Sequence, residues 1–281
     1  MELLAVVVVA FVLMATGYLG VSAVLRRLPA PRLRLPTEPF PPGWRGILER
    51  DVPLARGLTA EEREGLLRLA QLFVREKHFE GSGGLVVTEE MKVTIAAQAC
   101  LLLLHLEGPC YPTLRTVLVY PRGFIPKFAR SPHSGEIVSP PVPLEGESLS
   151  DGVVVISWED VIRGTQGLAD GENVVLHEFA HQLDTEDGVA DGAPVLPRSA
   201  LRTWGGVLAT EYERLRRDVA HGRRSTLDAY GATDEAEFFA VATEAFFEKP
   251  VQLERDHPDL YRELQRFYRQ DPARRSPATA R

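Results

Sequence analysis

The chain has too few cysteines for a disulfide-based scaffold and no excess of basic residues for binding nucleic acid. Its 281 residues include two cysteines, Cys100 and Cys110, too few for a disulfide-rich fold. Lys and Arg number 32 against 39 Asp and Glu, so the formal net charge is -7 and there is no basic excess for nucleic-acid partners. Internal repeats are also absent. The composition favours one globular domain of roughly 230 residues with a sizeable core.

A long apolar run at the amino end is the first feature that is present. Leu4 to Leu25 contains no charged residue and is long enough to cross a bilayer as a helix. A cleaved secretory signal is the competing interpretation, and Val21-Ser22-Ala23 weakly resembles a cleavage site. The start Met1-Glu2 lacks the positive charge of a signal peptide. We therefore predict a retained transmembrane helix over residues 4–25.

Basic residues follow this run and none precedes it. The basic residues are Arg26, Arg27, Arg32 and Arg34. Because positive residues beside a membrane span stay on the cytoplasmic side, these arginines predict a single-pass membrane protein whose folded domain faces the cytoplasm. Residues 26–42 are rich in Pro and Arg and predict an extended tether. The folded domain is expected over residues 43–271, and a disordered tail over residues 272–281.

Hydrophobic periodicity predicts a mainly helical α+β domain with a small mixed sheet. Helices are expected at residues 59–77, 88–106, 201–220 and 258–270, and strands at 116–120 and 152–157. The second strand either borders a cleft, where a free edge would bind an extended peptide, or lies in the core. Residues 131–145 are rich in Pro, Ser and Gly and predict a loop.

The most informative motif is an HExxH sequence, His177-Glu178-Phe179-Ala180-His181, within the apolar run VVLHEFAHQLD. Asn173 is a suitable N-cap for this helix. Residues four apart lie on one helix face, so both imidazoles can reach one cation while Glu178 lies beside them. Zinc binds neutral imidazole and, with three protein ligands, keeps a position for water. The alternative is a hydrogen-bonded structural pair of histidines.

A third ligand is expected from a second acidic helix downstream. Gly231 and Thr233 predict a turn and a helix cap, after which apolar residues recur at helical spacing. Glu237 and Glu244 lie seven residues apart and share one inward face of this helix. Either carboxylate is suited to complete the metal site.

Together, HEFAHQLD and DAYGATDEAEFFAVATEAFF resemble the Mlc titration factor A (MtfA) family of zinc metallopeptidases, and the motifs are similar to those of the anthrax lethal factor catalytic domain. The resemblance implies a zincin-like fold of the gluzincin type in which His177, His181 and Glu237 bind Zn²⁺. It also implies that Glu178 is the general base and that Tyr230 lies close to the metal. The resemblance covers roughly residues 43–272.

These assignments define a mechanism. Zinc polarises a water and the scissile carbonyl, and Glu178 carries the proton from the water to the leaving amine. Tyr230 would donate a hydrogen bond to the oxyanion; its alternative role is that of a half-buried turn residue. Asp184 either orients a ligand imidazole or caps the helix end.

The remaining histidines are spaced unlike ligands and are expected at structural or surface positions; they are His78, His105, His133, His221 and His257. A metal site made by Cys100, His105 and Cys110 is disfavoured by its spacing.

The resemblance permits two functions, and the apolar amino end adds a membrane anchor to the first. The first is a membrane-anchored zinc peptidase that acts on peptide or protein substrates. The second is a regulatory protein that sequesters a transcription factor, with proteolysis secondary. The HExxH glutamate favours the enzyme, since sequestration alone does not require Glu178 beside the metal. A structural metal site is a third possibility, but no fourth ligand has suitable spacing.

Overall fold

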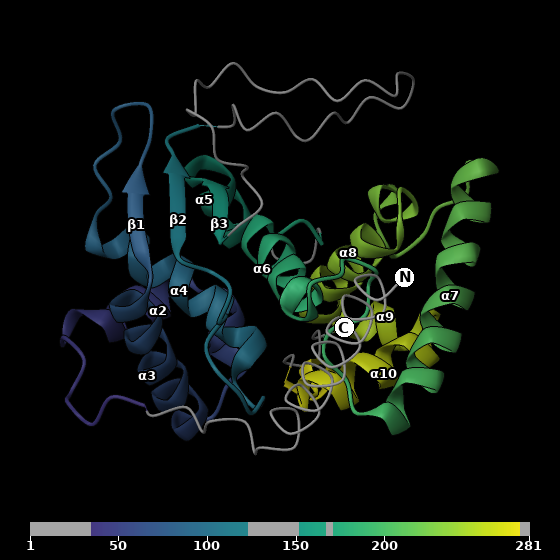
Figure 1. The fold of residues 1–281 in the computed structure, drawn as a ribbon, viewed down its shortest axis with the longest axis horizontal. Coiled ribbons are helices and arrows are strands. Elements are labelled where there is room, and N and C mark those ends of the chain that lie inside the picture. The colour runs from purple at the N-terminus through teal and green to yellow at the C-terminus, as the bar shows by residue number, and fades with distance from the viewer. Residues whose placement is uncertain (1–34, 123–151, 167–170, 276–281) are drawn as a thin grey trace, which may run out of the picture. The chain divides into compact units, whose positions relative to one another are not determined.

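The HExxH motif lies on a central helix, α6 (Val174–Asp184), which stands between a small sheet and the C-terminal helices (Figure 1). The structure is a computed structural model, which describes residues 35–122, 152–166 and 171–275. α6 contacts β3 and α4 on one side and α8 (Glu235–Glu248) on the other. The motif therefore lies where the two parts of the domain meet.

The sheet has three described strands in the order β1 (His78–Gly81), β2 (Thr116–Tyr120) and β3 (Val153–Ser157). Both pairings are parallel, with Val117 opposite Phe79 on one side and Val154 on the other. The small sheet was predicted, but the prediction of a mixed sheet is wrong for the described strands. Parallel pairing follows from helical crossovers such as α4, which joins β1 to β2.

In the described part of the chain, four helical segments precede the sheet's last strand. They are α2 (Gly43–Asp51), η1 (Pro53–Gly57), α3 (Ala60–Glu76) and α4 (Glu89–Leu103). α3 begins with a capping box, in which the Thr59 side chain accepts from the Glu62 backbone N–H and Glu62 accepts from Thr59 N–H. α4, where a helix was predicted, is buried from Val93 to its end and packs against α3 and α6.

The helices after the sheet build the other part of the domain. They are α5 (Trp158–Gln166), η2 (Thr185–Asp187), α7 (Arg198–Ala220), η3 (Ala229–Ala232), α9 (Pro250–Asp256), α10 (Pro258–Tyr268) and α11 (Pro272–Arg275), in addition to α6 and α8. Aromatic side chains fill the space between them: Phe246 of α8 lies 5.1 Å from Tyr261 and 5.6 Å from Tyr268 of α10 between ring centroids. A mainly helical α+β architecture is confirmed.

The predicted transmembrane helix over residues 4–25 lies outside the described residues, as does the start of the tether. In the part of the chain that the structure describes, no helix combines the length and apolar character needed to cross a membrane. The rest of the predicted tether, residues 35–42, forms no helix or strand, but Phe40 is buried. Of the residues predicted as a tail, Pro272–Arg275 form α11, and Arg275 forms an ion pair with Glu62.

Candidate metal centre

The HExxH helix starts where it was predicted to start. The Asn173 side-chain oxygen accepts the backbone N–H groups of Val175 and Leu176, each at 3.1 Å, which satisfies two of the free donors of the first turn. The opposite face of α6 is anchored by Phe179, whose ring lies 4.9 Å from Tyr111 and 5.5 Å from Phe73 between centroids. This packing directs the two motif histidines toward α8.

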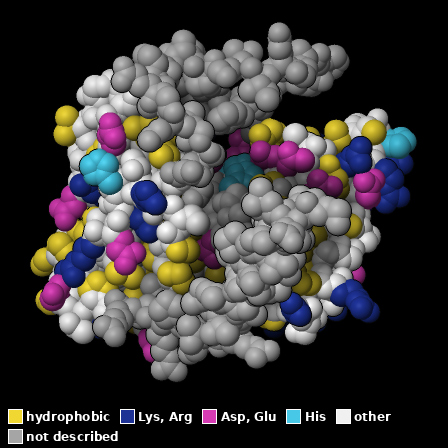
Figure 2. Space-filling model, viewed as in Figure 1, with side chains coloured by type: hydrophobic (Ala, Val, Ile, Leu, Met, Phe, Trp, Pro, Cys, Tyr) yellow, Lys and Arg dark blue, Asp and Glu magenta, His cyan; other side chains and the backbone are white. Residues whose placement is uncertain are grey.

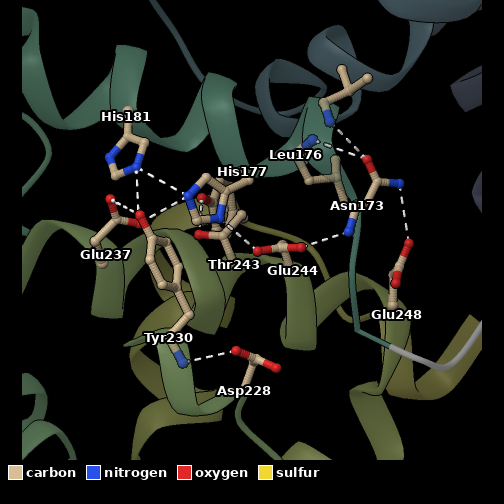
Figure 3. Close-up of polar contacts among 12 residues, drawn as sticks. Asn173, Leu176, His177, His181, Asp228, Tyr230, Glu237, Thr243, Glu244 and Glu248 are labelled. Atoms are coloured by element: carbon tan, nitrogen blue, oxygen red, sulfur yellow. Dashed lines mark hydrogen bonds and ion pairs between the residues drawn. The ribbon is translucent and has the colours of Figure 1, made fainter. Parts of the chain in front are cut away.

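Three predicted ligand side chains meet at one point (Figure 3). His177 Nε2 lies 2.9 Å and His181 Nε2 3.4 Å from Glu237 Oε2, and the two Nε2 atoms are 3.2 Å apart. The imidazoles come from consecutive turns of α6, and the carboxylate comes from the first turn of α8. These side chains are 14, 22 and 18 % exposed, in the order His177, His181 and Glu237, so the cluster is within reach of solvent.

Helix α8 begins one residue later than predicted. Asp234, not Thr233, is its N-cap, and its carboxylate accepts the backbone N–H of Glu237 at 2.9 Å. Thr233 instead bonds back to the carbonyl oxygen of Tyr230 at 2.7 Å. The cap therefore holds the backbone of the carboxylate residue that faces both imidazoles.

The electrostatics of the cluster favour a cation. Burial would raise the pKa of Glu237, but its contacts with His177 and His181 outweigh burial and hold the pKa well below its usual range. Burial would lower the pKa of His177, but hydrogen bonds to Glu237 and Glu244 raise it to about 10. Carboxylates on both sides of His177 thus stabilise positive charge at this place.

Glu178 follows His177 directly on α6 and remains partly exposed. Burial raises the pKa of its carboxyl group, and positive charge on His177 and His181 acts in the opposite direction. A carboxylate whose pKa moves toward neutrality is better suited to accept and return a proton. Its place beside the first histidine of the motif is the one that the sequence predicts.

Tyr230 reaches the cluster from η3, the short helix before α8 (Figure 3). Its hydroxyl donates to Glu237 Oε1 at 3.0 Å, and the Asp228 carboxylate accepts its backbone N–H at 2.7 Å. The next residue is Gly231, where a Cβ atom would lie 3.1 Å from Val241 and 3.2 Å from Leu215. The close packing at Gly231 thus places the Tyr230 phenol beside the candidate metal ligands.

Glu244, the second inward-facing glutamate of α8, contacts His177 on the side opposite to Glu237. Glu244 Oε1 lies 2.7 Å from Nδ1 of His177, so the two glutamates flank opposite nitrogens of the same ring. The shared inward face was predicted from the spacing of seven, but the contact to Nδ1 was not. Asp184 was predicted either to make this type of contact or to cap the end of α6. It is buried near the backbone N–H groups of Gly192 and Ala193 instead, and burial raises its pKa.

The loop after η2 is fixed against α8 at Gly192. Its φ of +74° is a conformation that favours glycine, and a Cβ atom there would lie 2.4 Å from the carbonyl oxygen of Glu235. The Gly192 carbonyl oxygen accepts the indole N–H of Trp204 at 3.1 Å. The loop is therefore held to both α7 and the first turn of α8.

Other residues of ligand type do not join the cluster. Cys100 and Cys110 are buried and free and contact each other, while His105 turns to Glu62, with 3.1 Å between Nε2 and Oε1. His78 and His221 are exposed and His257 is buried, as expected of surface and structural positions; His133 lies outside the described residues. In the described residues, three side chains form the one group suited to a metal.

The donor set fits a tetrahedral metal ion. Ligand bonds of about 2.0–2.1 Å in a tetrahedral site place neighbouring ligand atoms about 3.3–3.4 Å apart, close to the 2.9–3.4 Å observed between the three atoms. Glu237 Oε2 is buried, and both Nε2 atoms lie within 3.4 Å of it. On the face shown in Figure 2, acidic side chains gather beside histidine near the centre. Two imidazoles and one carboxylate are a ligand set that zinc accepts.

The comparisons with known proteins agree with the class that this geometry defines. The chain belongs to the glucose-regulated metallo-peptidase M90 family, whose model matches residues 26–269. Membership implies a metal, and the predicted family resemblance is confirmed.

Individual relatives match most of the chain. An uncharacterized protein of Synechocystis sp. is 38% identical over 236 residues, which cover 83% of this chain and 86% of that protein. The Mlc titration factor A proteins of Serratia proteamaculans and Pectobacterium atrosepticum are each 34% identical over 235 residues. Those matches cover 83% of this chain and 88% and 87% of the relatives, respectively.

Proposed function

We propose that this protein is a zinc-dependent peptidase with His177, His181 and Glu237 as metal ligands. The observation that carries the proposal is the convergence of these three ligand atoms from α6 and α8, with Glu178 next to the first ligand. Membership of a metallo-peptidase family supports peptide-bond hydrolysis. Two histidines and a glutamate suit zinc better than they suit calcium or magnesium, which prefer oxygen ligands.

The residues around the cluster take complementary roles. A bound zinc ion supplies a water of lowered pKa and polarises the scissile carbonyl. Glu178 accepts the proton of the attacking water and passes it to the leaving amine. Tyr230 moves its hydroxyl hydrogen bond from Glu237 to the oxyanion that forms on the substrate. Glu237 holds the metal while Asp234 holds the Glu237 backbone.

The fold assigned to this function is a gluzincin-type zincin domain over residues 43–271. The two histidines of α6 and the glutamate of a later helix form the ligand order expected of that type. Among the described strands, β3 is at one edge of the sheet and contacts α6. An extended substrate that pairs with β3 would be held by backbone hydrogen bonds, which tolerate different side chains.

We further propose that a transmembrane helix at residues 4–25 and a tether at residues 26–42 anchor the domain at the cytoplasmic face of a membrane. The support is the uncharged apolar run followed by four arginines. An anchor would concentrate the peptidase near membrane substrates. The tail that begins at residue 272 is assigned no catalytic role.

The second candidate is a regulator-binding protein in which proteolysis is secondary. The name Mlc titration factor A, carried by two relatives at 34% identity, supports it. In this alternative the partner is a regulatory protein, and sequestration persists without a functioning Glu178.

Metal content and peptidase activity of three variants test these proposals. Glu178→Gln should keep one zinc per chain and lose turnover, because the base is lost and the ligands remain. Glu237→Ala should lose both zinc and activity. Glu235→Gln is the matched control, since Glu235 is an exposed carboxylate in the same first turn of α8, and it should behave like the parent.

A parent protein without zinc would refute the metal assignment. A parent that holds zinc but cleaves none of a broad peptide panel would favour the regulator-binding alternative. In that case, Glu178→Gln should retain partner affinity. Fractionation of the full chain before and after removal of residues 1–35 tests the anchor, because the shortened protein should leave the membrane fraction.

A further inference from the structure

A continuous polar chain leads from the metal centre into the protein interior (Figure 3). It starts at Nδ1 of His177, which lies 2.7 Å from Glu244 Oε1. The other Glu244 oxygen, Oε2, accepts the backbone N–H of Asn173 at 2.5 Å. Glu244 is 6 % exposed and Asn173 is 2 % exposed. Buried polar groups are retained where each has a partner, as these do.

Asn173 uses its whole side-chain amide. Its Nδ2 donates to Gln98 of α4 at 2.9 Å and to Glu248 of α8 at 3.0 Å, while Oδ1 caps α6. Two donated and two accepted bonds satisfy the hydrogen-bonding capacity of the amide. One residue therefore ties the start of α6 to two neighbouring helices, and its backbone N–H fixes the orientation of the Glu244 carboxylate.

The consequence for His177 is a defined tautomer. A carboxylate at Nδ1 accepts a proton from that nitrogen, and this leaves the lone pair of the neutral ring on Nε2. Nε2 is the atom that faces His181 and Glu237. A metal ion requires an imidazole in this state and this orientation.

The other ligand candidate has no equivalent support. Among the described residues, no carboxylate contacts Nδ1 of His181, and Asp184, one turn later, lies near the N–H groups of Gly192 and Ala193 instead. The ring of His181 also lies edge-on to that of His177, with 4.8 Å between centroids. His177 is thus the ligand whose orientation is set by the interior of the protein.

We propose that Glu244 and Asn173 are positioning residues for His177, which set metal affinity from the start of α6 without touching the metal. The proposal rests on the proposed zinc function. It extends that function to two residues that lie behind the ligands. The hydrogen bonds concerned run from Asn173, the cap of α6, through the Glu244 carboxylate to Nδ1 of His177.

The zinc affinity of the full chain tests the proposal, measured by competition with a chromophoric chelator. Glu244→Gln keeps an acceptor oxygen without the charge and should weaken binding about 10-fold, whereas Glu244→Leu removes the hydrogen bond and should weaken it about 100-fold. Asn173→Ser keeps a side-chain oxygen for the cap but is too short to reach both Gln98 and Glu248. We expect this variant to bind zinc more weakly than the parent, by less than Glu244→Gln does; parent affinity in the folded variant would refute the role of Asn173.

The chain contains a matched control for general damage. Glu211 is also a buried glutamate that contacts Nδ1 of a histidine, His257, at 2.6 Å. Glu211→Gln should lower stability and leave zinc affinity unchanged. Circular dichroism verifies folding, and the visible absorption of the cobalt-substituted proteins reports ligand geometry. A change in the cobalt spectrum of Glu244→Gln, but not of Glu211→Gln, supports positioning.

The outcomes separate the two levels of inference. If the parent binds no zinc, the proposed function fails together with this proposal. If the parent binds zinc and both folded Glu244 variants bind it with the parent's affinity, the positioning role is refuted and the peptidase proposal stands. If Glu211→Gln weakens zinc as much as Glu244→Gln, the effect is one of general stability and the positioning role is again refuted.

Discussion

Two histidines among the described residues are held at Nδ1 by a buried glutamate, and they have different surroundings. Glu244 lies 2.7 Å from His177 and Glu211 lies 2.6 Å from His257. The far nitrogen of His177 faces the carboxylate of Glu237 and the imidazole of His181. His257 is 2 % exposed and joins α7 to the junction of α9 and α10. A buried carboxylate–imidazole pair is therefore not in itself a metal site; further ligands at the second nitrogen make the difference.

The largest expected effects come from removing each imidazole in turn. His257→Ala should lower the free energy of unfolding by about 3 kcal/mol, because Glu211 stays buried without its main partner; Arg214 remains 3.4 Å away and limits the loss. His177→Ala should abolish zinc binding instead. Urea unfolding and metal analysis of both variants measure these results. Loss of zinc in a folded His257→Ala protein would contradict the comparison.

The next effect concerns Tyr230, whose phenol lies beside the first pair. Tyr230→Phe should lower kcat by about 100- to 1,000-fold, because a donor to the oxyanion is lost, and should keep its zinc. Steady-state kinetics with a cleaved peptide gives the rate, and metal analysis gives the control. An unchanged kcat would assign Tyr230 to the structure of η3 and not to catalysis.

Metal binding should also be linked to proton release at the first pair. Hydrogen bonds to Glu237 and Glu244 overcome burial and raise the pKa of His177 to about 10, so we expect the metal-free ring to hold a second proton, on Nε2, at neutral pH. Zinc must displace the proton. We expect release of about one proton per zinc at pH 7 and an affinity that rises with pH. Calorimetry in buffers of different ionisation enthalpy counts the protons; a count of zero would refute the linkage.

The smallest expected effect is at a half-buried carboxylate that lacks an imidazole. Burial raises the pKa of Glu186 to about 7. A raised carboxyl pKa gives stability that is complete below the unfolded-state value and is lost as pH rises through 7. Glu186→Gln should therefore lose less stability than the parent between pH 5 and pH 8. Thermal unfolding at the two pH values measures this, and parallel losses would show that Glu186 does not titrate in this range.

The sequence could predict what depends on short spacing. The placement of His177 and His181 on one helix face, the Asn173 cap and the common face of Glu237 and Glu244 all follow from helical periodicity. Which nitrogen each glutamate faces depends on how α8 crosses α6, and no local pattern contains that angle. Asp184 shows the same limit: although it follows His181 by three residues, tertiary packing places it near the backbone of the next loop.

The sheet shows a different limit. β2 and β3 carry β-branched runs and were predictable, whereas β1 has the sequence His-Phe-Glu-Gly and no alternating pattern. It becomes a strand because its backbone pairs with β2. Strand direction likewise depends on the path of the connections, so the parallel arrangement was not accessible from residue types.

The glycine that fixes the loop to α8 restricts how this protein can vary. Any side chain at Gly192 would meet the Glu235 carbonyl oxygen and displace the first turn of α8, two residues before Glu237. Selection of single substitutions for retained activity should therefore reject replacements at position 192 as consistently as at the ligand positions. Position 192, although glycine has no side chain, would then tolerate as few substitutions as the catalytic positions.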